Sequence, residues 1–146
     1  MSASPHARVP RPRLDPIRSV DDALLVFRAQ LTRPLRAETL AMFLDDNDCG
    51  STLVTVTDTS DPFQILEVAE AMALAGATSP DVTALVLASV RPGGGPLPGD
   101  DDLWLGASDV VGECGLTLVD WFVIGRHGTF IPREALGVPS RWSSGR

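Results

Sequence analysis

VTALVLASVRPGGGPLPGDDDLWLGASDVVGECGLTLVDWFVI, residues 82–124, is the stretch of the chain that decides its fold. Its two near-continuous apolar runs, 82–90 and 116–124, predict strands that are covered on both faces. Between them, residues 100–114 place apolar side chains at helical spacing behind three aspartates, which predicts a helix. The stretch therefore predicts an α/β unit.

The segments around this unit extend the same pattern. Upstream we expect a helix over 20–31 capped by Ser19, a hairpin of strands 38–44 and 51–57, and a helix that Asp61 caps and Gly76 ends. Downstream we expect a hairpin turn at 125–128, a return strand over 129–132 and a helical turn at 134–136. This order predicts an α/β sandwich around a mixed sheet.

The chain is predicted to form one domain with two extensions. Residues 19–137 form the domain, whose length suits a single hydrophobic core. Residues 1–18 are rich in proline and arginine, and we expect them to be a disordered arm. Residues 138–146 are predicted to be a flexible tail.

The composition indicates which classes of binding partner are not expected and in which cellular compartment the chain is expected. The net charge is −7, and the arm holds four of the twelve arginines against one aspartate, so the rest of the chain carries −10. An acidic body repels phosphate backbones, so direct nucleic-acid binding is not expected. No apolar run approaches the roughly 20 residues that span a bilayer, and the N-terminus lacks the apolar segment of a secretory signal. With two cysteines and no disulfide framework, a cytoplasmic chain is expected.

The loop between the first buried strand and its helix carries a motif. Residues 89–102 resemble the JAB motif of the RadC family, His-x-His-Pro-Ser-Gly-x-Pro-x-Pro-Ser-x-x-Asp, without a gap. The positions that match are Pro92, Gly94, Pro96, Pro98 and Asp102. Downstream, Gly115-Leu116, the segment 120–125 and Arg133-Glu134 resemble further segments of that family.

The resemblance implies a JAB/MPN-like fold, a cytidine-deaminase-like three-layer sandwich of a mixed sheet with flanking helices. In catalytic members two histidines and the aspartate bind zinc, a glutamate activates the zinc-bound water, and the serine stabilises the oxyanion. Here Ser89 and Arg91 stand at the histidine positions and Gly99 at the serine position. Asp102 is the only ligand position retained, and the region 51–57, where the glutamate is expected, has no carboxylate.

These replacements predict a pseudoenzyme. No catalytic residue is assigned, and neither zinc nor another cofactor is expected, because a guanidinium repels a divalent cation. Either the loop does no chemistry, or Arg91 pairs with Asp102 in a repurposed pocket. The triplet Asp100, Asp101 and Asp102 offers carboxylates to Mg²⁺ or Ca²⁺, but three adjacent acids at this point are interpreted as a charge match for the start of the helix.

Two functions follow from the resemblance. The first is a catalytically inactive binding or scaffold module with a protein partner, linked to DNA repair by the family alone. The alternative is a metal-dependent hydrolase of the peptidase or isopeptidase kind, with non-standard ligands around Asp102.

Overall fold

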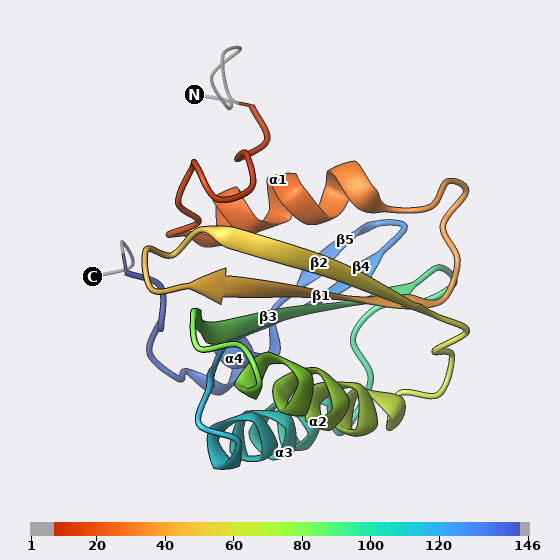
Figure 1. The fold of residues 1–146 in the computed structure, drawn as a ribbon. Helices are drawn as coiled ribbons and strands as arrows, with labels where there is room; N and C mark the ends of the chain where they lie inside the picture. The colour runs from red at the N-terminus through yellow and green to blue at the C-terminus, as the bar shows by residue number, and fades with distance from the viewer. Residues whose placement is uncertain (1–7, 144–146) are drawn as a thin grey trace.

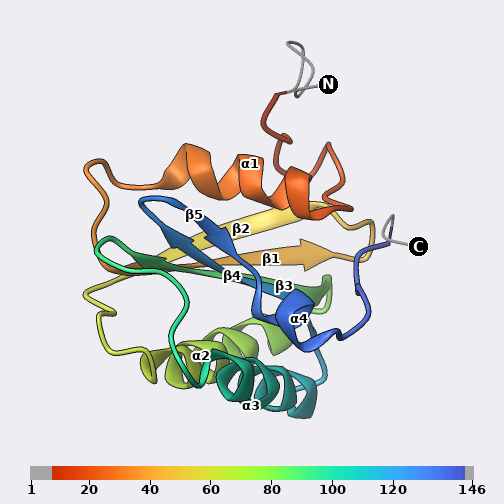
Figure 2. The same cartoon turned by 180° about the vertical axis from the view of Figure 1, so that it is seen from behind.

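The computed structural model describes residues 8–143 and forms three layers. A five-stranded sheet lies between α1 on one face and α2 with α3 on the other (Figures 1 and 2). The helices are α1 (Val20–Gln30), α2 (Gln64–Ala77), α3 (Asp100–Glu113) and α4 (Pro132–Leu136). The strands are β1 (Glu38–Asp45), β2 (Gly50–Thr57), β3 (Val82–Arg91), β4 (Thr117–Gly125) and β5 (Gly128–Phe130).

The sheet is mixed, as predicted, with strand order β2-β1-β3-β4-β5. β1 pairs antiparallel with both β2 and β3, β3 pairs parallel with β4, and β5 returns antiparallel along β4. The helix α3 is the crossover between the two parallel strands, which brings the start of α3 close to the end of β3. The α/β class, the hairpin and the central unit are therefore confirmed.

Alternation along β3 explains its nearly unbroken apolar run. Leu85 and Leu87 pack in the cluster beneath α2 and α3, whereas Val86, Ala88 and Val90 pack in the cluster beneath α1. A strand in the middle of a covered sheet must be apolar on both faces, because neither face meets water. The same alternation directs Ser89 to the α2–α3 side.

The prediction that Gly76 ends the second helix is wrong, because α2 continues to Ala77. Gly76 is buried, and a Cβ at this position would lie 2.9 Å from a ring carbon of Phe43 and 3.0 Å from a methyl group of Leu116. The glycine thus permits the close approach of α2 to the sheet. The predicted cap of α1 is confirmed, because the Ser19 side chain accepts the N–H of Asp22. The predicted Asp61 cap of α2 is wrong: the N-cap residue is Phe63, and Asp61 accepts the N–H of Phe63 in the turn before the helix.

The two predicted extensions contact the domain where the structure describes them. Ile17 is buried and donates its N–H to the carbonyl of Asp48, while the N–H of Arg13 bonds the carbonyl of Gly50. The disorder predicted for residues 1–18 stays a prediction, and residues 1–7 lie outside the described residues. The flexible tail predicted for 138–146 also stays a prediction: Trp142 is buried and bonds Asp120, and 144–146 lie outside the described residues.

A buried carboxylate holds the C-terminal segment against the sheet. Asp120, on β4, is fully buried and accepts hydrogen bonds from Nε and Nη2 of Arg133 at 3.1 and 3.0 Å. It also accepts the indole N–H of Trp142 at 2.8 Å, and Arg133 donates to the carbonyl of Val138. Because the pair is excluded from water, each partner depends on the other.

Asp120→Ala is expected to lower the free energy of unfolding by about 3–5 kcal/mol, because it leaves the Arg133 charge buried without a partner. Trp142→Phe, the matched control, removes one N–H donor and keeps the ion pair, so about 1.5–3 kcal/mol is expected. Urea denaturation of both variants measures the difference, and equal losses would contradict the assigned role of the ion pair.

Candidate functional site

Two of the predicted site residues lie together at the end of β3. Ser89 and Arg91 are two residues apart, so both side chains project from the α2–α3 side of the sheet. Thr39 on β1 lies directly opposite Ser89 in the strand register. From this end of β3 the Pro/Gly loop, residues 92–99, leads into the first turn of α3.

The guanidinium of Arg91 is held by Asp100 in a bidentate pair. Nη2 lies 2.7 Å from Oδ1 of Asp100, and Nη1 lies 2.9 Å from Oδ2. The side chains are only 13% and 4% exposed. Nη1 also donates to the carbonyl of Gly95, and Asp100 accepts the N–H of Leu97 at 2.7 Å. One ion pair therefore ties together β3, the loop and α3.

The predicted partner of Arg91 is wrong: it is Asp100 and not Asp102. Asp102 is exposed, and its backbone N–H bonds the side chain of Asp101. Two residues along a helix turn the side chain by about 200°, so Asp100 and Asp102 face opposite directions. Gly99 precedes the helix with φ of 92°, a conformation that suits glycine, and it has no side chain to contribute.

Ser89 is bound to a residue that the sequence did not indicate. The indole N–H of Trp121, on β4, donates to the Ser89 hydroxyl at 2.9 Å. The Trp121 ring also lies 5.8 Å from the Arg91 guanidinium carbon, within the range of a cation–π contact. Because Trp121 is fully buried, it holds the side chains of Ser89 and Arg91 in place.

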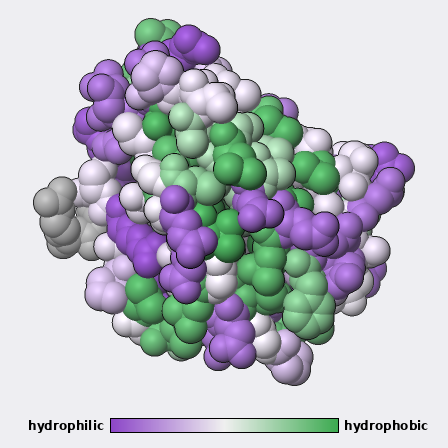
Figure 3. Space-filling model, turned by 60° about the horizontal axis from the view of Figure 1, so that its bottom comes forward, coloured by the Kyte–Doolittle hydropathy of each residue, from purple (hydrophilic) through white to green (hydrophobic). Residues whose placement is uncertain are grey.

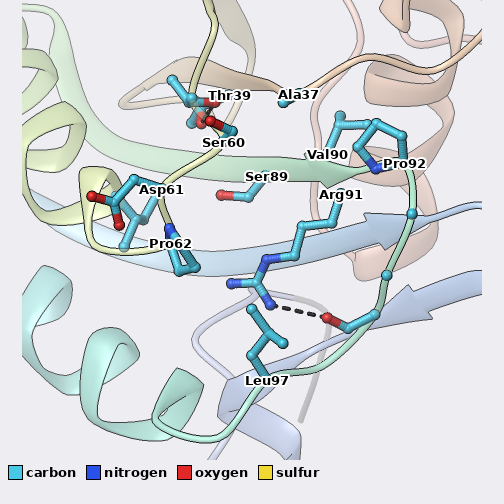
Figure 4. Close-up of a pocket in the computed structure, with 15 residues that line it drawn as sticks. Ala37, Thr39, Ser60, Asp61, Pro62, Ser89, Val90, Arg91, Pro92 and Leu97 are labelled. Atoms are coloured by element: carbon cyan, nitrogen blue, oxygen red, sulfur yellow. Dashed lines mark hydrogen bonds between the residues drawn. The ribbon is translucent and has the colours of Figure 1, made fainter.

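A pocket of about 230 Å³ opens above these side chains. Thr39, Ser60 and Ser89 contribute hydroxyl groups to its lining, whereas Pro62 and Leu97 contribute apolar surface. Figure 4 shows Arg91 extending from β3 across the pocket, with its guanidinium between Pro62 and Leu97 and with Ser89 above it. The structure thus unites Ser89 and Arg91 in one cavity and leaves Asp102 outside it.

The side chains at this site do not fit a zinc ion. Ser89 accepts a hydrogen bond, Arg91 carries a positive charge, and the carboxylate of Asp100 is already satisfied by three donors. Within residues 8–143 no group of three histidine, cysteine or acidic side chains is arranged to hold a metal ion. A catalytic zinc site needs three such protein ligands.

The residues that could substitute for the lost ligands lie elsewhere. Cys49 belongs to the hairpin end of β1 and β2, at the far end of the sheet, and burial raises the pKa of its thiol. Cys114 follows the last turn of α3, and His127 is exposed in the turn between β4 and β5. Glu38, a buried carboxylate on β1, faces the α1 side and accepts two hydrogen bonds from Thr32.

No protein-family model matches the chain, and no curated protein shows significant similarity to it. The described residues contain no helix that is both long and apolar enough to cross a membrane.

Asp100→Ala is expected to lower the free energy of unfolding by about 3–5 kcal/mol, because it leaves Arg91 mostly buried without its partner. The amide of Leu97, which donates to Asp100, should exchange with solvent faster. Asp102→Ala is the matched control and should change stability by less than about 0.5 kcal/mol. Denaturation and hydrogen exchange measure both effects, and a larger loss in the Asp102 variant would refute the assignment.

Proposed function

We propose that this chain is a non-catalytic binding module with a JAB/MPN-like fold, in which the former metal site has lost its ligands. The observation that carries the proposal is the bidentate Arg91–Asp100 pair. It lies at the position where the resemblance to the RadC family would place a zinc ligand. A fixed organic cation takes the place of a bound metal cation there.

Electrostatics supports the loss of metal chemistry. A divalent cation beside Arg91 would meet a permanent positive charge, since guanidinium does not deprotonate in proteins. To displace that charge, the ion would have to break a buried pair, which costs about 3–5 kcal/mol when one partner is left behind. The alternative function is a metal-dependent hydrolase with ligands around Asp102. The Asp102 side chain is exposed, and no contact it makes with the described residues supports this alternative.

Exposed apolar side chains on and beside α2 and α3 support a protein partner. Phe63, just before α2, is 69% exposed, and Leu97 at the pocket is 43% exposed. Leu74 and Leu105 add exposed apolar side chains on α2 and α3. Figure 3, which brings this side of the molecule forward, shows hydrophobic surface interrupted by hydrophilic groups. Exposed apolar side chains of this kind favour a protein contact over an acidic nucleic-acid backbone.

The cellular setting of the module is also proposed. A cytoplasmic location follows from the two free cysteines and from the composition of the chain. A link to DNA repair follows from the family resemblance alone.

Metal content tests this function directly. Wild-type protein dialysed after incubation with zinc should retain far less than one equivalent by elemental analysis, because Arg91 excludes the ion. The variant that combines Ser89→His and Arg91→His supplies two imidazoles at the positions of the resemblance, so it should retain more zinc. Stoichiometric zinc in the wild-type protein would overturn the proposal, and an unchanged double variant would contradict the assigned positions.

A further inference from the structure

Arg91 has hydrogen-bonding capacity that the ion pair does not use. A guanidinium has five N–H donors in a fixed plane. Three of them are accounted for: both on Nη1, to Gly95 and Asp100, and one on Nη2, to Asp100. Within residues 8–143, Nε–H and the second Nη2–H have no hydrogen-bond acceptor. These two donors are parallel and form one edge of the guanidinium plane.

The free donors belong to a side chain that lines the pocket. In Figure 4 the Arg91 side chain crosses the pocket below Ser89, and one terminal nitrogen points to Pro62. The other terminal nitrogen is directed to the loop carbonyl of Gly95. The edge between Nε and Nη2 therefore faces the side of the cavity bounded by Ser89 and Pro62.

Hydroxyl groups add further donors on the same cavity. The Ser89 oxygen accepts from Trp121, and among the described residues its own proton has no acceptor. Thr59 accepts from Thr39 at 2.9 Å and likewise donates to none of these residues. Both side chains line the pocket, so its polar part offers donors. A ligand that displaces water from this part of the pocket must supply acceptors for these donors.

Geometry rather than net charge selects the kind of acceptor. Asp100 already balances the charge of Arg91, so long-range attraction of anions is weak. Two parallel N–H donors fit a group with two adjacent oxygens, as in the bidentate pairing of arginine with carboxylate. The nearby Asp61 carboxylate points away from Arg91 and accepts the N–H of Phe63, so it does not occupy this edge.

We propose that the pocket binds a carboxylate through Nε and Nη2 of Arg91, with the Ser89 hydroxyl as an additional donor. This inference rests on the proposed function, because it gives the binding module a ligand class. Pro62, Ile65 and Leu97 would pack against a short apolar body next to the carboxylate. The volume of about 230 Å³ is below the roughly 300–1,000 Å³ that is usual for ligand pockets, so the bound group is small: an organic acid or the end of a peptide.

A matched pair of ligands tests the proposal. ¹⁵N-labelled full-length protein is titrated with N-acetylglycine and with its neutral isostere N-acetylglycinamide. The Trp121 indole signal reports binding because this N–H bonds Ser89 in the pocket. We expect a saturable shift with a millimolar dissociation constant for the acid and binding about tenfold weaker for the amide. No shift with the acid, or equal shifts with both, would overturn the proposal.

Substitutions test whether the guanidinium edge of Arg91 binds the carboxylate. Arg91→Lys keeps a charge opposite Asp100 but loses the two parallel donors, so the acid should bind about tenfold more weakly. Arg126→Lys, at an exposed position outside the pocket, is the control and should leave binding unchanged. If Arg91→Lys does not fold, Ser89→Ala, read from the backbone amides of Gly93, Gly94, Gly95 and Leu97, should weaken binding several-fold. Undiminished affinity in a folded pocket variant would contradict the assignment.

A peptide separates the two sources of the carboxylate. A short apolar peptide with a free C-terminus should bind more tightly than N-acetylglycine if the natural ligand is a chain end, and its amidated form should not. If the peptide binds no better, the ligand is a small acid. The zinc content of the same sample is measured as well. A protein that holds no zinc and does not bind carboxylates would refute this inference and leave the proposed function standing.

Discussion

The bidentate contact between Arg91 and Asp100 is the constraint on which the candidate site depends. It joins the end of the central strand β3 to the first turn of α3, and through Gly95 and Leu97 it fixes the loop between them. Because the pair is mostly buried, it is not easily exchanged for solvent or for an ion. This contact therefore determines the shape of the pocket and the orientation of the N–H donors that Arg91 presents to it.

A second arginine–aspartate pair joins the neighbouring strand, β4, to another segment of the chain. Asp120 on β4 binds Arg133 and Trp142, and so docks the C-terminal segment on the sheet. The Trp121 side chain, next in sequence, supports Ser89 and Arg91. The two parallel strands β3 and β4 thus each carry one member of an arginine–aspartate pair, one pair for the pocket and one for the terminus.

The sequence predicted the fold class and most elements because their apolar patterns are strong: a nearly unbroken apolar run in β3 and apolar residues at helical spacing in α3. It did not predict the partner of Arg91, although the signal exists. Asp100 lies three, four, seven and eleven residues before Leu103, Trp104, Ala107 and Val111, which are all buried, so it belongs to the buried stripe of α3. The contact of Trp121 with Ser89 and the docking of Trp142 depend on tertiary packing, which local patterns do not contain.

The guanidinium of Arg91 and the carboxylate of Asp100 act as one unit at the site. A double-mutant cycle with Arg91→Met and Asp100→Leu measures this coupling most directly, since the double variant replaces the pair by apolar groups. We expect a coupling energy of about 2 kcal/mol or more in the free energy of unfolding. Single-variant effects that add to within about 0.5 kcal/mol would contradict it.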